Sequence, residues 1–71
     1  MKRYFFHAAG ALTLHDIAGT LLANANAARL HAERRWHQLQ HHHPADDVVI
    51  IVTDESGKAL FEVTGERVVG R

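Results

Sequence analysis

The first residues of the chain carry the alternation of side chains that is typical of a β-strand. Residues 3–8 are rich in aromatic side chains, which favour extended backbone. Successive side chains of a strand point to opposite faces, so Tyr4 and Phe6 share one face while Phe5 and His7 share the other. The pattern therefore predicts an N-terminal strand with large side chains on both faces.

The segment that follows predicts a second strand and a turn. Gly10 supplies a turn, and residues 11–15 alternate leucines with polar side chains, which favours a half-buried strand in a hairpin. Residues 16–19 are typical of a turn, because an aspartate side chain can accept hydrogen bonds from the backbone ahead of it and glycine adopts a positive φ. We expect residues 20–22 to be extended.

A helix is predicted from Asn24, whose side chain can cap the first turn, to His41. At 100° per residue, one face is narrow and mostly alanine, and it ends in a tryptophan that supplies bulk between helix and sheet. Leu30 falls on the opposite face and is expected to be exposed. The residues of the predicted buried face are Ala25, Ala28, Ala32, Trp36 and Leu39.

The second half of the chain predicts a further hairpin. Residues 48–52 are apolar on both faces, as in a central strand, and residues 54–57 form a turn that ends in glycine. Residues 58–64 alternate, with Ala59, Phe61 and Val63 predicted to face inward. The fold class is therefore α+β, in the order ββαββ: a small antiparallel sheet of two hairpins packed on one long helix.

Length and composition bound the domain organisation. The chain has 71 residues and no cysteine, so a single domain is expected without disulfides or thiolate metal sites. We assign residues 1–64 to that domain and residues 65–71 to a tail that is either flexible or paired with a partner. Eight basic and eight acidic residues cancel. No apolar run approaches the roughly 20 residues of a membrane span, and the N-terminus lacks a signal-peptide pattern, so we expect a cytoplasmic protein.

The seven histidines are the unusual feature of the composition. His37 and His41 are four residues apart, which places both on one side of a helix at a spacing used for Zn, Ni or Cu, and His43 could reach the same ion from the loop. A solvated polar face explains the same residues. His15 and Asp16 are also of metal-ligand type, but the chain is too short for the further ligands of metal-dependent phosphohydrolases.

Other chemistries find little support in the sequence. No nucleophile–base pair can be named, so we do not expect an enzyme. The helical arginines do not form one stripe, which argues against nucleic-acid binding. The predicted core leaves out three apolar or aromatic side chains, those of Phe5, His7 and Leu30. A small core that no disulfide stabilises favours association with a second chain. We therefore predict a non-enzymatic interaction or regulatory module that acts as a homodimer or with a partner protein; the alternative is a histidine-based transition-metal binder or sensor.

Several short motifs resemble a family of short bacterial proteins classed as a domain of unknown function. They are Arg-Tyr-Phe-Phe at residues 3–6, Asp16 with Gly19, the helical Ala-Arg-x-x-Ala at residues 28–32, and Val-x-Asp-x-x-Gly at residues 52–57. The resemblance implies a fold and assigns no activity. The layout is similar, more distantly, to the strand-rich domain of HicB-type antitoxins.

Overall fold

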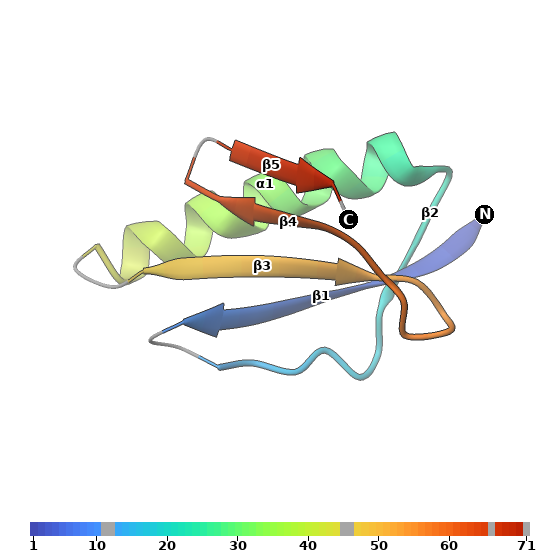
Figure 1. The fold of residues 1–71 in the computed structure, drawn as a ribbon, viewed down its shortest axis with the longest axis horizontal. Coiled ribbons are helices and arrows are strands. Elements are labelled where there is room, and N and C mark those ends of the chain that lie inside the picture. Colours follow the sequence, from blue (N-terminus) through green and yellow to red (C-terminus); the bar gives the residue numbers. More distant parts are fainter. Residues whose placement is uncertain (11–12, 45–46, 66, 71) are drawn as a thin grey trace.

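The computed structural model describes residues 1–10, 13–44, 47–65 and 67–70 (Figure 1). Within these residues the chain forms one antiparallel sheet in the order β2-β1-β3-β4-β5 and one helix, α1. The predicted α+β fold with the order ββαββ is confirmed, and β5 is added after it. The elements are β1 (Lys2–Gly10), β2 (Thr20–Leu22), α1 (Ala25–His42), β3 (Val48–Thr53), β4 (Ala59–Thr64) and β5 (Arg67–Gly70).

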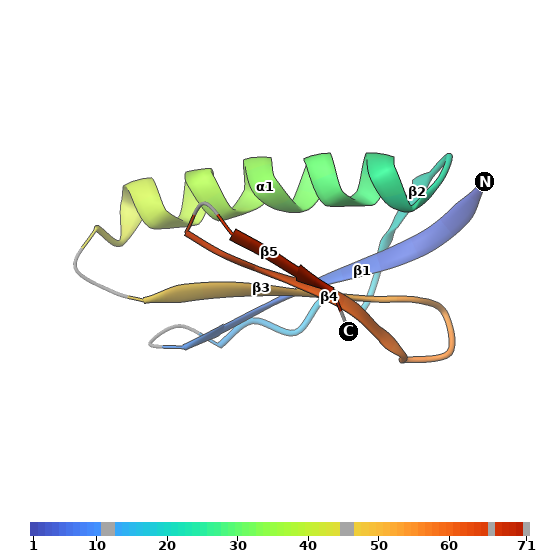
Figure 2. The ribbon, with the colours of Figure 1, turned by 45° about the horizontal axis from the view of Figure 1, so that its top comes forward.

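The core lies between α1 and one face of the sheet, as the edge-on view in Figure 2 shows. Alternate residues of the three central strands point to the helix and are buried, whereas their neighbours along each strand are half-buried on the other face. This period of two is the pattern on which the strands were predicted. The buried apolar side chains of the sheet are Tyr4, Phe6, Ala8, Val48, Ile50, Val52, Phe61 and Val63.

Helix α1 begins where the sequence predicts, because the Asn24 side chain accepts a hydrogen bond of 2.9 Å from the backbone N–H of Ala27. Ala28 and Ala32 are fully buried, so the backbone of the helix lies close to the sheet. Leu30 is 46% exposed, as expected for the opposite face. Ala25 was predicted to lie on the buried face of the helix but is exposed. The buried residues of the helix begin with Ala28.

The prediction of a strand at residues 11–15 is wrong for residues 13–15, which form no strand. Ala11 and Leu12 lie outside the described residues. Leu14 makes one isolated bridge with Ala8, and the strand next to β1 is β2 instead. The cause is Asp16, whose carboxylate accepts the hydrogen bond of the Phe6 N–H that a strand would otherwise take.

The C-terminal hairpin follows the prediction with two additions. β3 lies at the centre of the sheet and is joined to β4 by a turn in which Gly57 has a φ of 85°. A bulge lies after Val52, and Leu60 packs against the core there in place of Ala59, which was predicted to face inward. The backbone of β5 pairs with β4 within the same chain. No helix in the described part of the chain is both long and apolar enough to cross a membrane.

Candidate functional site

Residues 13–19, here called the edge loop, run along the side of β1 that β2 leaves open. Asp16 holds this loop in place: its Oδ2 accepts from the N–H of Phe6 at 3.1 Å, and its Oδ1 accepts from Ala18 at 3.1 Å and Gly19 at 3.0 Å. Burial raises the pKa of the Asp16 carboxyl, but the backbone hydrogen bonds together outweigh this and hold its pKa below the usual value. Asp16 is therefore an ionised anchor of the loop.

His7 joins the edge loop to the centre of the sheet. Its Nδ1 accepts a hydrogen bond of 3.1 Å from the backbone N–H of Asp16, and its Nε2 lies 3.1 Å from the Thr53 hydroxyl. A backbone N–H can only donate, so the proton of the neutral ring resides on Nε2 and is donated to Thr53. Burial lowers the pKa of His7, and the neighbouring His15, stacked at 4.5 Å, lowers it further against the opposing effect of Asp16.

This cluster has the residue types of a catalytic triad but the wrong hydrogen bonding. A histidine that activates a hydroxyl must accept its proton at the nitrogen facing it. Here Nε2 of His7 carries the proton toward Thr53, and the Asp16 carboxylate bonds to backbone N–H groups instead of to the ring. The hydroxyl of Ser56 donates to Asp54 within the β3–β4 turn at 2.6 Å. The geometry of both groups is that of structural hydrogen bonds.

The sequence places His7 outside the predicted core and does not predict this cluster. His15 and Asp16 were considered only as a metal-ligand pair. Nothing in the sequence indicates that both would contact His7, because the contact depends on the edge loop returning along β1. His15 and Asp16 follow His7 by eight and nine residues, a separation that by itself predicts no contact.

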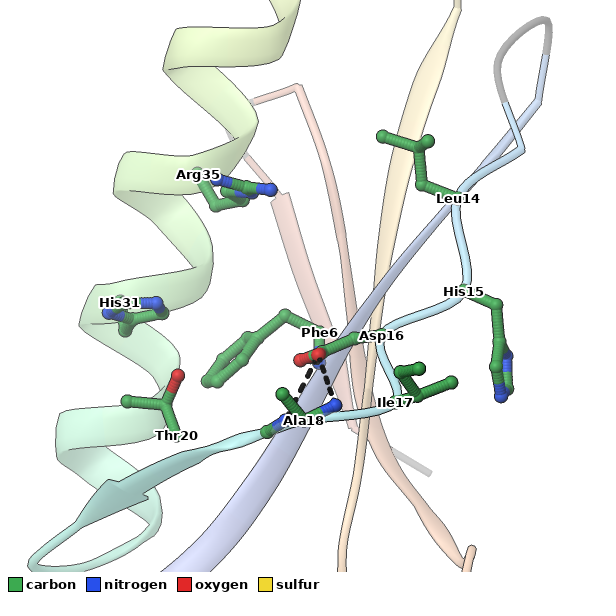
Figure 3. A pocket seen from close by; sticks show the side chains of 10 residues that line it. Phe6, Leu14, His15, Asp16, Ile17, Ala18, Thr20, His31 and Arg35 are labelled. Atoms are coloured by element: carbon green, nitrogen blue, oxygen red, sulfur yellow. Dashed lines mark hydrogen bonds between the residues drawn. The ribbon is translucent and has the colours of Figure 1, made fainter.

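A hollow of about 400 Å³ lies between the edge loop and α1 (Figure 3). Phe6 of β1 points from the sheet toward the helix, and its ring lies 4.5 Å from that of His31. His31 and Arg35, four residues apart on α1, form the helical wall. His15 of the edge loop also lines the hollow, although its ring points away from the helix.

The histidines predicted to bind metal lie at the C-terminal end of α1. His37 and His41 are exposed on the helix, and His43 caps its end through N–H bonds to Leu39 and Gln40. Among the described residues, no three His, Asp or Glu side chains come together as a set that could hold an ion. Of the two aspartates that could supply a further ligand after the helix, Asp46 lies outside the described residues and Asp47 is exposed. Metal binding by His37, His41 and His43 stays a prediction.

The residues predicted as interface lie on two separate surfaces. Phe5 and His7 belong to the open face, defined here as the side chains of β1, β3 and β4 that point away from α1. Leu30 is exposed on α1, and α1 covers the opposite face of the sheet (Figure 2). These three residues therefore cannot contribute to one flat contact surface.

Comparison with known proteins identifies a family without assigning an activity. A family model described as a domain of unknown function, DUF6894, matches residues 3–65. The match covers most of the chain, so the protein belongs to this family. Neither the curated proteins nor the solved structures contain a match to this chain.

Proposed function

We propose that this member of the DUF6894 family is a non-enzymatic interaction module that associates through the open face of its sheet, as a homodimer or with a partner chain. The observation that carries the proposal is the composition of that face. Val49 and Ile51 of the central strand lie on it half-buried, beside Phe5 and Ala9 of β1. A sheet in a two-layer domain is normally covered on its apolar faces.

The proposed surface is centred on β3. At its β1 side the edge loop already covers part of the face, because His15 stacks on His7. Ile51 pairs in register with His7 on one side and Glu62 on the other, so it lies in the middle of the face. An apolar centre bordered by polar groups is the usual anatomy of a protein–protein contact.

Each of the two hydroxyl groups close to a histidine or carboxylate, Thr53 and Ser56, makes a structural hydrogen bond. An antitoxin-like role is one form that such an interaction module could take, and it stays a prediction. A toxin-like gene beside this one would favour it.

Sedimentation velocity at micromolar concentration tests the homodimer. The variants are Ile51→Lys on the open face and Leu30→Lys on the outer face of α1, which add the same charge on opposite surfaces. We expect the wild type and Leu30→Lys to sediment as dimers and Ile51→Lys as a folded monomer. The introduced ammonium would lie beside Glu62, which favours folding of the variant. A monomeric wild type would overturn the homodimer, and a dimer lost only in Leu30→Lys would overturn the open face as the association surface.

A further inference from the structure

The hollow between the edge loop and α1 has the size and lining of a small-molecule site. Its volume of about 400 Å³ is within the usual range of ligand pockets. One wall is the helical pair His31 and Arg35, and the floor is the ring of Phe6. It lies on the helix side of the edge loop, away from the open face, so it is separate from the proposed association surface.

Two basic side chains of α1, His31 and Arg35, offer hydrogen-bond donors to the hollow. Arg35 is exposed, and among the described residues its guanidinium has neither an ion pair nor a hydrogen bond. His31, four residues before Arg35 on α1, has its ring 4.5 Å from that of Phe6. The carboxylate of Asp16 also lines the hollow, but both of its oxygens already accept hydrogen bonds from backbone N–H groups. Arginine binds carboxylates through two parallel hydrogen bonds.

The same hollow has an apolar rim. Leu14 is 43% exposed and Ile17 is 84% exposed, and both line it from the edge loop. These two belong to the few large apolar side chains that the described residues leave open to solvent. Together with the Phe6 ring they offer contact area to the apolar part of a ligand, whereas a bare inorganic anion would leave them uncovered.

We propose that this hollow binds a small organic carboxylate. Its carboxylate group lies against Arg35 and His31, and its apolar body lies on Phe6 between Leu14 and Ile17. The arrangement favours a molecule of the size of an aromatic or branched short-chain acid. Its binding fixes the edge loop against α1 and leaves the open face free.

The test is a titration of ¹⁵N-labelled protein with 3-phenylpropionate, followed by NMR chemical shifts at constant pH and ionic strength. The variant is Arg35→Ala, and the matched control is Arg34→Ala, which removes the same charge from an exposed neighbouring position. We expect saturable shifts in the edge loop and around His31 with a dissociation constant in the millimolar range or below. Arg35→Ala should weaken binding at least roughly tenfold, the loss of one charge-assisted contact, and Arg34→Ala should not.

Inorganic phosphate and 3-phenylpropanol serve as comparison probes. We expect weaker shifts with either, because phosphate lacks the apolar body and the alcohol lacks the charge. Equal shifts with phosphate would show that the hollow binds any anion and would overturn the proposal that its ligand is an organic carboxylate. Absence of saturable shifts, or equal loss in Arg35→Ala and Arg34→Ala, would overturn the site itself.

Discussion

Trp36 connects α1 to the sheet by two interactions, and replacing it separates them. Its half-buried ring packs against the core beside the alanine stripe, and its Nε1–H donates to the backbone carbonyl of Val48 at 2.7 Å. Trp36→Phe keeps most of the packing and removes the hydrogen bond. Trp36→Ala removes both. The two variants therefore divide the contribution of this residue into a hydrogen bond and buried apolar area.

The expected magnitudes follow from burial. Deleting a fully buried large aromatic costs about 3–5 kcal/mol, and Trp36 is only partly buried, so we expect about 3 kcal/mol for Trp36→Ala. The hydrogen bond alone should account for about 1 kcal/mol in Trp36→Phe. A domain of this size is stabilised by only ~5 kcal/mol or slightly more. Trp36→Ala should therefore be near the limit of folding.

Urea unfolding followed by far-ultraviolet circular dichroism measures these differences without relying on tryptophan fluorescence. The control is Gln38→Ala, at an exposed position of the same helix, which should change the free energy of unfolding by less than about 0.5 kcal/mol. If Trp36→Ala were as stable as this control, the ring would not contribute to the contact between helix and sheet, and the account of the core would be wrong.

Three further predictions concern the edge loop, the turns and the helical histidines. The pKa of His7 is lowered on folding, so the unfolded chain binds a proton at this residue more readily than the folded one. The free energy of unfolding should therefore decrease as the pH drops through the ordinary histidine range near ~6.5. Urea unfolding at several pH values should show a smaller decrease for His7→Gln than for the wild type. Gly19→Ala should cost more stability than Gly57→Ala in the same assay: both positions have a positive φ, but only at Gly19 would a methyl group meet other side chains, the nearest carbon at 2.7 Å. Calorimetric Zn²⁺ titration of tag-free protein should show weaker binding when His37 and His41 are both replaced by alanine. Equal binding by the variant and the wild type would show that these histidines are solvated surface residues and not metal ligands.

The strands and the helix could be predicted because their signals are local. The aromatic residues of segment 3–8, the apolar run at residues 48–52, the cap at Asn24 and the glycine at position 57 are each signals of a few neighbouring residues, and each is confirmed. The ring of Trp36 was also expected to lie between helix and sheet, because a stripe of alanines allows close approach.

The remaining features depend on contacts between distant residues. The segment before Asp16 has the alternation of a strand, yet a side-chain carboxylate takes the place of a strand partner on β1. The bulge that brings Leu60 to the core has no signal in a short alternating segment. The hollow between the edge loop and α1 could not be predicted either, because His31 and Arg35 read as ordinary surface residues until the loop is placed opposite them.

The central claim is that the open face of the sheet is the association surface, and intermolecular nuclear Overhauser effects test it most directly. An equal mixture of ¹³C-labelled and unlabelled protein reports only contacts between two copies in an isotope-filtered experiment. We predict contacts from the methyl groups of Val49 and Ile51, both on that face. Contacts confined to Leu30 on the outer side of α1, or none at the highest soluble concentration, would contradict the account.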